Sequence, residues 1–296
     1  MKIRCLFALV FFLFTGTAGA VEITNVRHWA APDHTRVVID VGSEPSYEVE
    51  EGVNTLTLRF KESRLKKDIP GEFTINKPGI KKVVIIPAAN DALKIEFLLD
   101  KYQKTSVFKL KKFQDKPDRV VVDIILEQEI KENKSGVAKP KVKPPKIIVI
   151  DPGHGGEDPG AIGKGRSYEK NIVLKLSREI KKEINKIPGY QAILTRDGDY
   201  YVSFSKRLQI ARDNNASLFI SVHADAARNS RAKGSSVYCL STGAASSEAA
   251  RLLAKNENLS DIIGGVADGD GGNGSDLIIL NMFQTNTINL SRIYAG

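Results

Sequence analysis

Cysteine, histidine and long apolar runs are scarce in this chain of 296 residues, and each scarcity excludes a class of structure. Its two cysteines are Cys5 and Cys239, and the first lies in a leader-like stretch, so we expect a fold without an internal disulfide. After that stretch, no apolar run is long enough for a membrane-spanning helix, so we expect no membrane span. With 42% hydrophobic and 27% charged residues, the composition excludes a disordered chain and favours two folded domains.

The first twenty residues have the pattern of a secretory signal peptide. Lys2 and Arg4 precede the apolar stretch 5–14, and the small residues Ala18 and Ala20 supply a cleavage site. A buried N-terminal helix is the alternative, but the following residues do not continue its pattern. We therefore expect residues 1–20 to be removed and the remainder to be exported.

The net charge of +9 comes partly from the leader and partly from one lysine-rich stretch. In an exported protein, such a charge favours an anionic wall or membrane surface as partner, so we expect no nucleic-acid partner.

Residues 21–127 consist of short β-branched or alternating runs separated by turn residues, which predicts an all-β sandwich. The predicted strands are 35–41, 54–60, 82–86, 93–97 and 119–124. His28, Trp29 and His34 near its start fit turn or half-buried positions better than a metal site. Residues 128–146 are rich in lysine and proline, which predicts an extended tether, with a basic arm that contacts the wall as the alternative.

Beyond the tether, from residue 147 onward, the apolar pattern changes to strands that alternate with helices. Strands are expected at 147–150, 192–195 and 218–222, and a helix at 203–214 is capped by Ser203. A further helix ends at Pro188-Gly189, and its expected apolar stripe is Val173, Leu176, Ile180, Ile184 and Ile187. The fold class predicted for the whole chain is an α/β catalytic domain, with a mostly parallel sheet flanked by helices, plus a separate all-β sandwich N-terminal domain.

Two of the four histidines follow predicted strands of this sheet. His154 lies in the segment DPGHGG after the first strand, and His223 follows the strand 218–222 directly. Parallel strands end at one rim, and Glu169 begins the long helix nearby. Two imidazoles and a carboxylate leave a fourth position for water, as in catalytic zinc sites. Hydrogen-bonded rim histidines and a carboxylate at a helix N-terminus are the simpler alternative.

Other motifs favour other chemistries only weakly. The glycines form neither a dinucleotide fingerprint nor a phosphate-binding loop. Ser203 and Lys206 match the S-x-x-K pattern of penicillin-recognising serine enzymes, but a helix cap explains Ser203 more simply.

Five motifs give the chain a family resemblance: DPGHGG at 151–156, EDPGA at 157–161, YEK at 168–170, SVHAD at 221–225 and KGSSV at 233–237. Residues 147–296 resemble the zinc-dependent N-acetylmuramoyl-L-alanine amidases of the AmiA/AmiB/AmiC type. The resemblance implies one zinc ion held by His154, Glu169 and His223. It also implies a periplasmic hydrolase that cuts the amide between N-acetylmuramic acid and L-alanine of peptidoglycan, in wall remodelling and daughter-cell separation. The N-terminal segment resembles the AMIN domain, which targets such amidases to the envelope.

The resemblance also implies regulation. Residues 244–275 correspond to an insertion whose helix blocks the zinc until an activator of the EnvC or NlpD type displaces it. Glu257 is the candidate for the blocking carboxylate, and a solvated helical charge is the alternative.

The family's general base, a glutamate on a late strand, is expected beyond Gly296. We therefore expect a catalytic domain that is incomplete at its C-terminus, no catalytic residue within the chain, and little or no activity. Glu157 and Asp225 are conceivable substitutes, although Asp225 fits better as a group that orients a ligand. The alternatives for the function are a non-hydrolytic peptidoglycan-binding protein and a zinc peptidase acting on the stem peptide.

Overall fold

The computed structural model describes residues 20–101, 103–126, 144–224, 234–238 and 259–266. The predictions of a signal peptide, of most of the tether and of the blocking residue Glu257 lie outside these residues. Within the described residues, no helix is long and apolar enough to cross a membrane.

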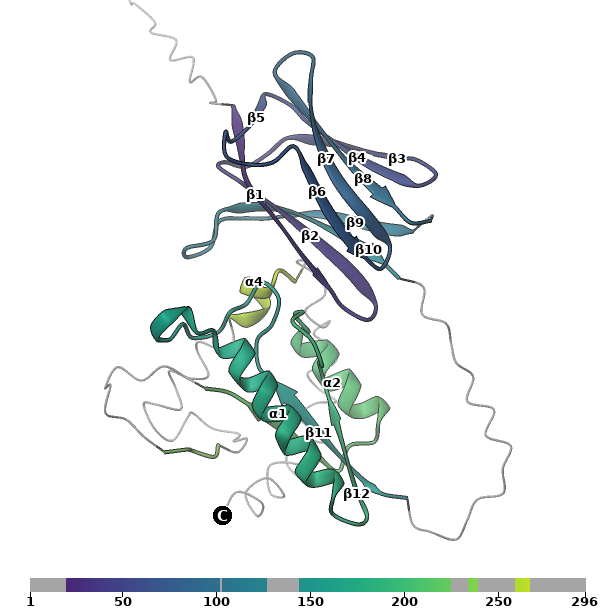
Figure 1. The fold of residues 1–296 in the computed structure, drawn as a ribbon, viewed down its shortest axis with the longest axis vertical. Helices are drawn as coiled ribbons and strands as arrows, with labels where there is room; N and C mark the ends of the chain where they lie inside the picture. Colours follow the sequence, from purple (N-terminus) through teal and green to yellow (C-terminus); the bar gives the residue numbers. More distant parts are fainter. Residues whose placement is uncertain (1–19, 102, 127–143, 225–233, 239–258, 267–296) are drawn as a thin grey trace, which may run out of the picture.

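Residues 21–125 form two five-stranded sheets, drawn at the top of Figure 1. One sheet has the order β5-β1-β2-β10-β9 and the other β3-β4-β8-β7-β6. The strands are β1 (Val21–Ala30), β2 (His34–Val41), β3 (Tyr47–Glu51), β4 (Thr55–Phe60), β5 (Ser63–Leu65), β6 (Glu72–Lys77), β7 (Ile80–Ala88), β8 (Ala92–Leu99), β9 (Lys104–Leu110) and β10 (Asp118–Ile125). We call this unit the β-sandwich.

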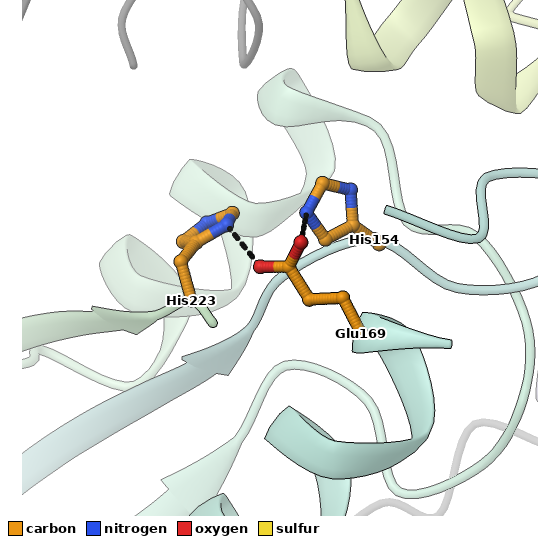
Figure 2. A group of neighbouring side chains, drawn as sticks. All are labelled: His154, Glu169 and His223. Carbon is orange, nitrogen blue, oxygen red and sulfur yellow. Dashed lines mark ion pairs between the residues drawn. The ribbon is translucent and has the colours of Figure 1, made fainter. Parts of the chain in front are cut away.

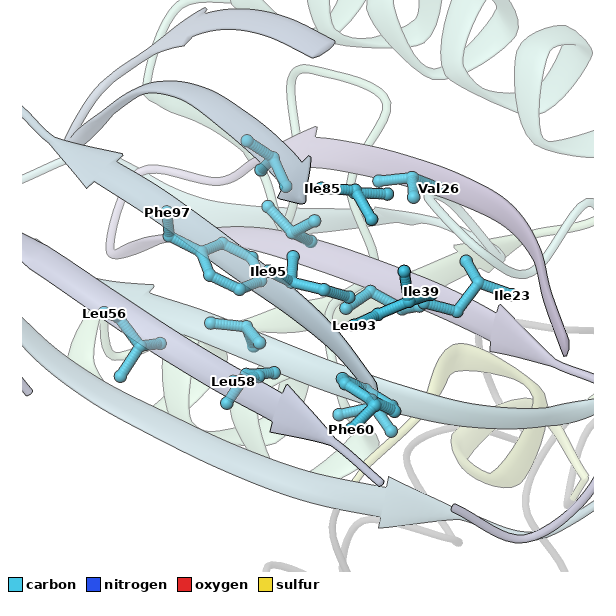
Figure 3. Packing of buried hydrophobic residues seen from close by; sticks show 14 of the residues in the cluster. Ile23, Val26, Ile39, Leu56, Leu58, Phe60, Ile85, Leu93, Ile95 and Phe97 are labelled. Carbon is cyan, nitrogen blue, oxygen red and sulfur yellow. The ribbon is translucent and has the colours of Figure 1, made fainter. Parts of the chain in front are cut away.

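The β-sandwich has its own hydrophobic core, because alternate residues of both sheets face inward (Figure 3). Ile39 of β2, Leu58 of β4 and Ile95 of β8 are fully buried. The five strands predicted from the sequence correspond to β2, β4, β7, β8 and β10, with β4 beginning one residue later than predicted, at Thr55. Among the strands that were not predicted, β3 and β6 expose most of their residues and therefore lack the apolar pattern that identifies a strand. That the β-sandwich is a separate domain stays a prediction.

The second part of the fold is a parallel sheet with the order β12-β11-β13, which confirms the predicted strand direction. Its strands are β11 (Lys146–Pro152), β12 (Tyr190–Leu194) and β13 (Leu218–Val222). The helices beside it are η1 (Lys164–Arg166), α1 (Glu169–Asn185), α2 (Phe204–Asp213) and α4 (Ser260–Gly264) (Figure 1). Ser203 caps α2 by accepting a hydrogen bond from the Lys206 backbone, as predicted.

Helix α1 packs on the sheet with a face that is slightly rotated from the predicted stripe and keeps three of its residues. Val173 is buried, and Ile180 and Ile184 pack against the same cluster, but Leu176 is 47% exposed. Ile187, which is 51% exposed, lies beyond the end of the helix at Asn185. The buried face instead passes through Ser177, which is fully buried, so the stripe runs in steps of four, three and four residues. This rotation leaves Glu169, at the first position of the helix, on the buried face.

Candidate metal centre

The ends of β11 and β13 bring two histidines together. Pro152 is aligned with Val222 across the parallel pair, and the Gly153 N–H donates to the Val222 carbonyl (3.0 Å). The rings of His154 and His223, which follow these residues, are consequently 4.9 Å apart between centroids and nearly perpendicular. The expectation that both imidazoles lie on one rim of the sheet is confirmed.

Helix α1 places the Glu169 carboxylate between the two rings (Figure 2). Its Oε2 lies 3.3 Å from Nε2 of His154, and its Oε1 lies 3.4 Å from Nδ1 of His223. In a tetrahedral zinc site with bonds of 2.0–2.1 Å, ligand atoms lie about 3.4 Å from one another. The three residues offer one ligand atom each within a mutual distance of 4.8 Å, so their spacing and donor types fit such an ion.

Two backbone donors fix the Glu169 carboxylate. The Ala161 N–H donates to Oε2 (2.8 Å), and the Ala224 N–H donates to Oε1 (2.6 Å). Glu169 is only 3% exposed. The carboxylate is thus held in a defined orientation, and its role goes beyond a favourable interaction with the helix dipole.

The His154 ring is oriented by Asp158, a residue that we did not single out from the sequence. Nδ1 of His154 lies 2.8 Å from Oδ2 of Asp158, whose other oxygen accepts the Gly160 N–H (3.0 Å). A carboxylate that holds the proton on Nδ1 leaves Nε2 as the donor atom for a metal, a common arrangement behind zinc-binding histidines. In the sequence, the indication of this role is that an aspartate follows His154 four residues later.

The turn that carries His154 needs an unusual backbone conformation. His154, Gly155 and Gly156 have positive φ values of 60°, 124° and 55°. A Cβ atom at position 155 would come within 2.2 Å of the Tyr200 carbonyl oxygen, so only glycine fits there. The glycines of the motif therefore let the chain turn closely against residue 200, and the left-handed conformation of His154 must be held by neighbouring groups.

Two buried arginines hold this turn by its carbonyl oxygens, and neither was predicted from the sequence. Arg196, 1% exposed, donates to the carbonyls of Pro152 (3.0 Å) and Gly153 (2.6 Å). Arg207 from α2 donates to the carbonyls of Pro152 (3.0 Å) and His154 (3.2 Å). Burial, reinforced by the nearby charge of Arg207, lowers the pKa of Arg196 to about 10.

Asp151, at the end of β11, forms a buried ion pair with Arg207. Its carboxylate accepts hydrogen bonds from Thr195 Oγ1 (2.6 Å), Arg207 Nη1 (2.5 Å) and Ser221 Oγ (2.9 Å). These donors come from the ends of β12 and β13 and from α2. Asp151 therefore connects these three elements to the end of β11 by hydrogen bonds.

The titration behaviour reflects a buried imidazole between two carboxylates. Burial by itself lowers the pKa of His154, but Asp158 and Glu169 outweigh it and raise that pKa to about 10. Burial works to raise the pKa of Glu169, whereas hydrogen bonds from His154 and His223 lower it well below its usual range. Without metal, we therefore expect His154 to carry a second proton, on Nε2, which a metal must displace.

Glu157, one of the conceivable substitutes for a general base, forms ion pairs with residues of the β-sandwich. Its carboxylate is paired with Arg27 and Arg119 and is 1% exposed. Asp225 and Glu257 lie outside the described residues.

Comparisons with known proteins give the following relatives. Residues 148–270 match the family model Amidase_3, described as N-acetylmuramoyl-L-alanine amidase. The chain is 29% identical over 300 residues to the amidase AmiC of Escherichia coli O6:H1, covering 92% of this chain and 72% of that protein. It is 41% identical over 146 residues to AmiC of Neisseria meningitidis, covering 49% of this chain and 35% of that protein. It is 38% identical over 167 residues to AmiA of Escherichia coli K12, covering 55% of this chain and 57% of that protein.

Among solved structures, the amidase AmiC2 of Nostoc punctiforme matches with 42% identity and a TM-score of 0.27, covering 28% of this chain and 46% of that one. An amidase from Clostridium difficile 630 matches with 29% identity and a TM-score of 0.29, covering 31% of this chain and 50% of that one.

Proposed function

We propose that this protein hydrolyses the amide between N-acetylmuramic acid and L-alanine in peptidoglycan, because residues 148–270 match the Amidase_3 model of N-acetylmuramoyl-L-alanine amidases. Its homologues AmiC and AmiA carry the name of that activity. The observation that carries the proposal is the group His154, Glu169 and His223, whose ligand atoms lie together at the carboxyl ends of parallel strands. We place the reaction in wall remodelling and daughter-cell separation.

We propose zinc as the metal of this site, bound through Nε2 of His154, one carboxylate oxygen of Glu169 and Nδ1 of His223. Bound zinc supplies a water of near-neutral pKa and polarises the carbonyl that is attacked. Asp158 keeps a proton at Nδ1 of His154, so that Nε2 faces the ion. The N–H groups of Ala161 and Ala224 hold the Glu169 carboxylate in place while it shares the positive charge.

The remaining roles follow the resemblance. We propose export to the periplasm after removal of residues 1–20, and envelope targeting by residues 21–127. We propose that the insertion 244–275 blocks the site through Glu257 until an EnvC- or NlpD-type activator binds. The net charge of +9 suits a polymer that carries anionic groups.

The test is product analysis after a long incubation with purified peptidoglycan and Zn²⁺. Amidase cleavage frees the amino group of L-alanine without creating new reducing sugar ends. We expect Glu169→Gln to remove this product, because the variant takes away one anionic ligand. The matched control is Glu179→Gln on the exposed face of the same helix, which should leave product formation unchanged.

Two results would contradict the proposal. Binding to peptidoglycan without any freed amino group, even after the long incubation with Zn²⁺, would favour the alternative of a non-hydrolytic wall-binding protein. Freed amino groups from residues other than the first alanine would identify a peptidase that acts on the stem peptide.

A further inference from the structure

We propose that the β-sandwich is a positioning part of the metal centre, because its cations bind Glu157, three residues after His154, and thereby hold the turn that carries this histidine. The proposed function treats the β-sandwich as a targeting module. The inference adds a direct structural role at the site, and its zinc readout rests on the proposed function.

Three cations of the β-sandwich converge on Glu157. Arg119 Nη1 lies 2.6 Å from Oε2, and both side chains are 1% exposed. Arg27 Nη1 lies 2.7 Å from Oε1. Lys116 Nζ donates to the backbone carbonyl of Glu157 (3.2 Å). The residue is therefore held at its side chain and at its backbone, by groups that all belong to the other part of the fold.

The two arginines have fixed positions in their own sheet. Arg119 lies in the interior strand β10, between β2 and β9, where it is aligned with Asp40 of β2. Arg27 of β1 donates from Nε to the carboxylate of the same Asp40 (3.1 Å). One sheet thus presents both guanidinium groups at a set spacing, and a single carboxylate fits between them with one oxygen on each.

A second contact joins the β-sandwich to helix α4, which lies between the two parts of the fold in Figure 1. Arg36 donates from Nη1 to the carbonyls of Gly264 (2.9 Å) and Gly265 (2.7 Å). Asp123 binds the same guanidinium through two contacts of 2.7 Å. These carbonyls end α4, where a cation is favourable because the helix dipole is negative there.

The path from this interface to the metal ligand is short. Asp158, the next residue after Glu157, contacts Nδ1 of His154, and a hydrogen bond links the Ser260 side chain of α4 to Asp158. The Asp158 and Gly155 backbones exchange two hydrogen bonds (3.0 and 2.9 Å). Because His154 adopts a left-handed conformation, the turn depends on such outside contacts, and the β-sandwich supplies those at residue 157.

The experiment compares Glu157→Gln with the unsubstituted protein, using the full chain without metal. The substitution keeps the size of the side chain but leaves Arg27 and Arg119 facing a neutral group in a buried site. The control is Glu48→Gln, whose partner Lys61 and own side chain are both exposed on the β-sandwich. Circular dichroism verifies that both variants keep their β-structure.

Two readouts test the docking itself. We expect amide hydrogen exchange of the Gly155 and Asp158 N–H groups to rise at least about tenfold in Glu157→Gln, since their turn has lost its outside support. Exchange of β12 should stay unchanged as an internal reference. Small-angle scattering should give a larger radius of gyration for Glu157→Gln than for Glu48→Gln. Unchanged exchange at Gly155 and Asp158 would overturn the proposal, whether or not the radius changes.

A third readout is the affinity for zinc. We expect Zn²⁺, titrated alone against a competing chelator, to bind Glu157→Gln about tenfold more weakly, the lower end of the effect of groups behind metal ligands. Arg27→Gln, a milder change at a side chain that is 23% exposed, should shift exchange and zinc affinity in the same direction. Equal zinc affinity in all variants would overturn the positioning role. No zinc binding by the unsubstituted protein would overturn the proposed function, while exchange and scattering would still decide on docking.

Discussion

At the residue scale, two of the three proposed metal ligands, His154 and Glu169, have further contacts that orient their side chains. Asp158 occupies Nδ1 of His154, and two backbone N–H groups occupy the oxygens of Glu169. Such contacts restrict the side chains before any metal arrives, so less conformational entropy is lost on binding. The site is thus largely formed in the metal-free protein.

We predict that His154→Ala abolishes stoichiometric zinc uptake, because a site with only Glu169 and His223 lacks the third ligand. Elemental analysis after dialysis measures the bound metal. His34→Ala, at a histidine of the β-sandwich that pairs with Asp33, serves as the control and should keep about one zinc per chain. Full zinc content in His154→Ala would count against the ligand assignment.

A second prediction concerns the release of a proton when zinc binds. The raised pKa of His154, about 10, means that the metal-free site is protonated at pH 7, whereas a metal-bound imidazole is neutral. Zinc binding at pH 7 should therefore release about one proton, and the affinity should increase as the pH rises toward 10. Calorimetric titrations in buffers of different ionisation enthalpy measure the released proton. A release near zero would mean that His154 is already neutral without metal.

At the element scale, the rim of the parallel sheet is assembled by a few buried charges. The ends of β11 and β13 carry the two histidines, and the first turn of α1 carries Glu169. Helix α2 contributes no proposed ligand, but its Arg207 binds both Asp151 and the carbonyl of His154. The helix therefore acts on the site by fixing the backbone beneath it.

We predict that Arg207→Met lowers the free energy of unfolding by about 3–5 kcal/mol, because it leaves the buried Asp151 carboxylate without its cation. Urea denaturation followed by circular dichroism measures the change. Arg212→Met, at an exposed position of the same helix, is the matched control and should change stability by less than about 0.5 kcal/mol. Equal losses in the two variants would show that the buried pair does not stabilise the rim.

At the scale of the whole molecule, two hydrophobic clusters are joined by polar contacts. One cluster fills the β-sandwich and the other lies between α1 and the parallel sheet. The second is much the smaller, with Ile150, Val173, Ala192 and Val222 as its buried members among the described residues. A small apolar core gains more from an additional link between its elements than a large one does.

We accordingly predict that zinc stabilises the second part of the fold. At a free Zn²⁺ concentration one hundred times the dissociation constant, binding contributes about 2.7 kcal/mol, which corresponds to a rise of several degrees in Tm. Differential scanning calorimetry with Zn²⁺, with Mg²⁺ and with chelator measures the shift. Mg²⁺ should have no such effect, because it prefers oxygen ligands in octahedral geometry. A transition that does not respond to zinc would contradict this prediction.

Much of the second part could be predicted because its local patterns are strong. The apolar runs of β11 and β13 and the Ser203 cap are each set by neighbouring residues. Helix α1 ends at Asn185, three residues before the predicted stop at Pro188-Gly189. The exposure of Leu176 was not predicted, because steps of three and four residues allow two neighbouring phases on a helix. Ile187 is exposed because it lies beyond the end of α1. The strand β3 was not predicted either, since its side chains face solvent.

The sequence by itself determined the chemistry of the candidate site: a histidine in a glycine turn, a second histidine at a strand end and a glutamate at a helix start. Local backbone preferences and donor types suffice for that much. Only the tertiary structure decided that Asp158 orients His154, that Arg196 and Arg207 hold the turn, and that Glu157 belongs to Arg27 and Arg119. Apart from Asp158, these partners lie more than thirty positions away in the chain, and a buried charge selects its partner by burial and distance, which spacing along the sequence does not encode.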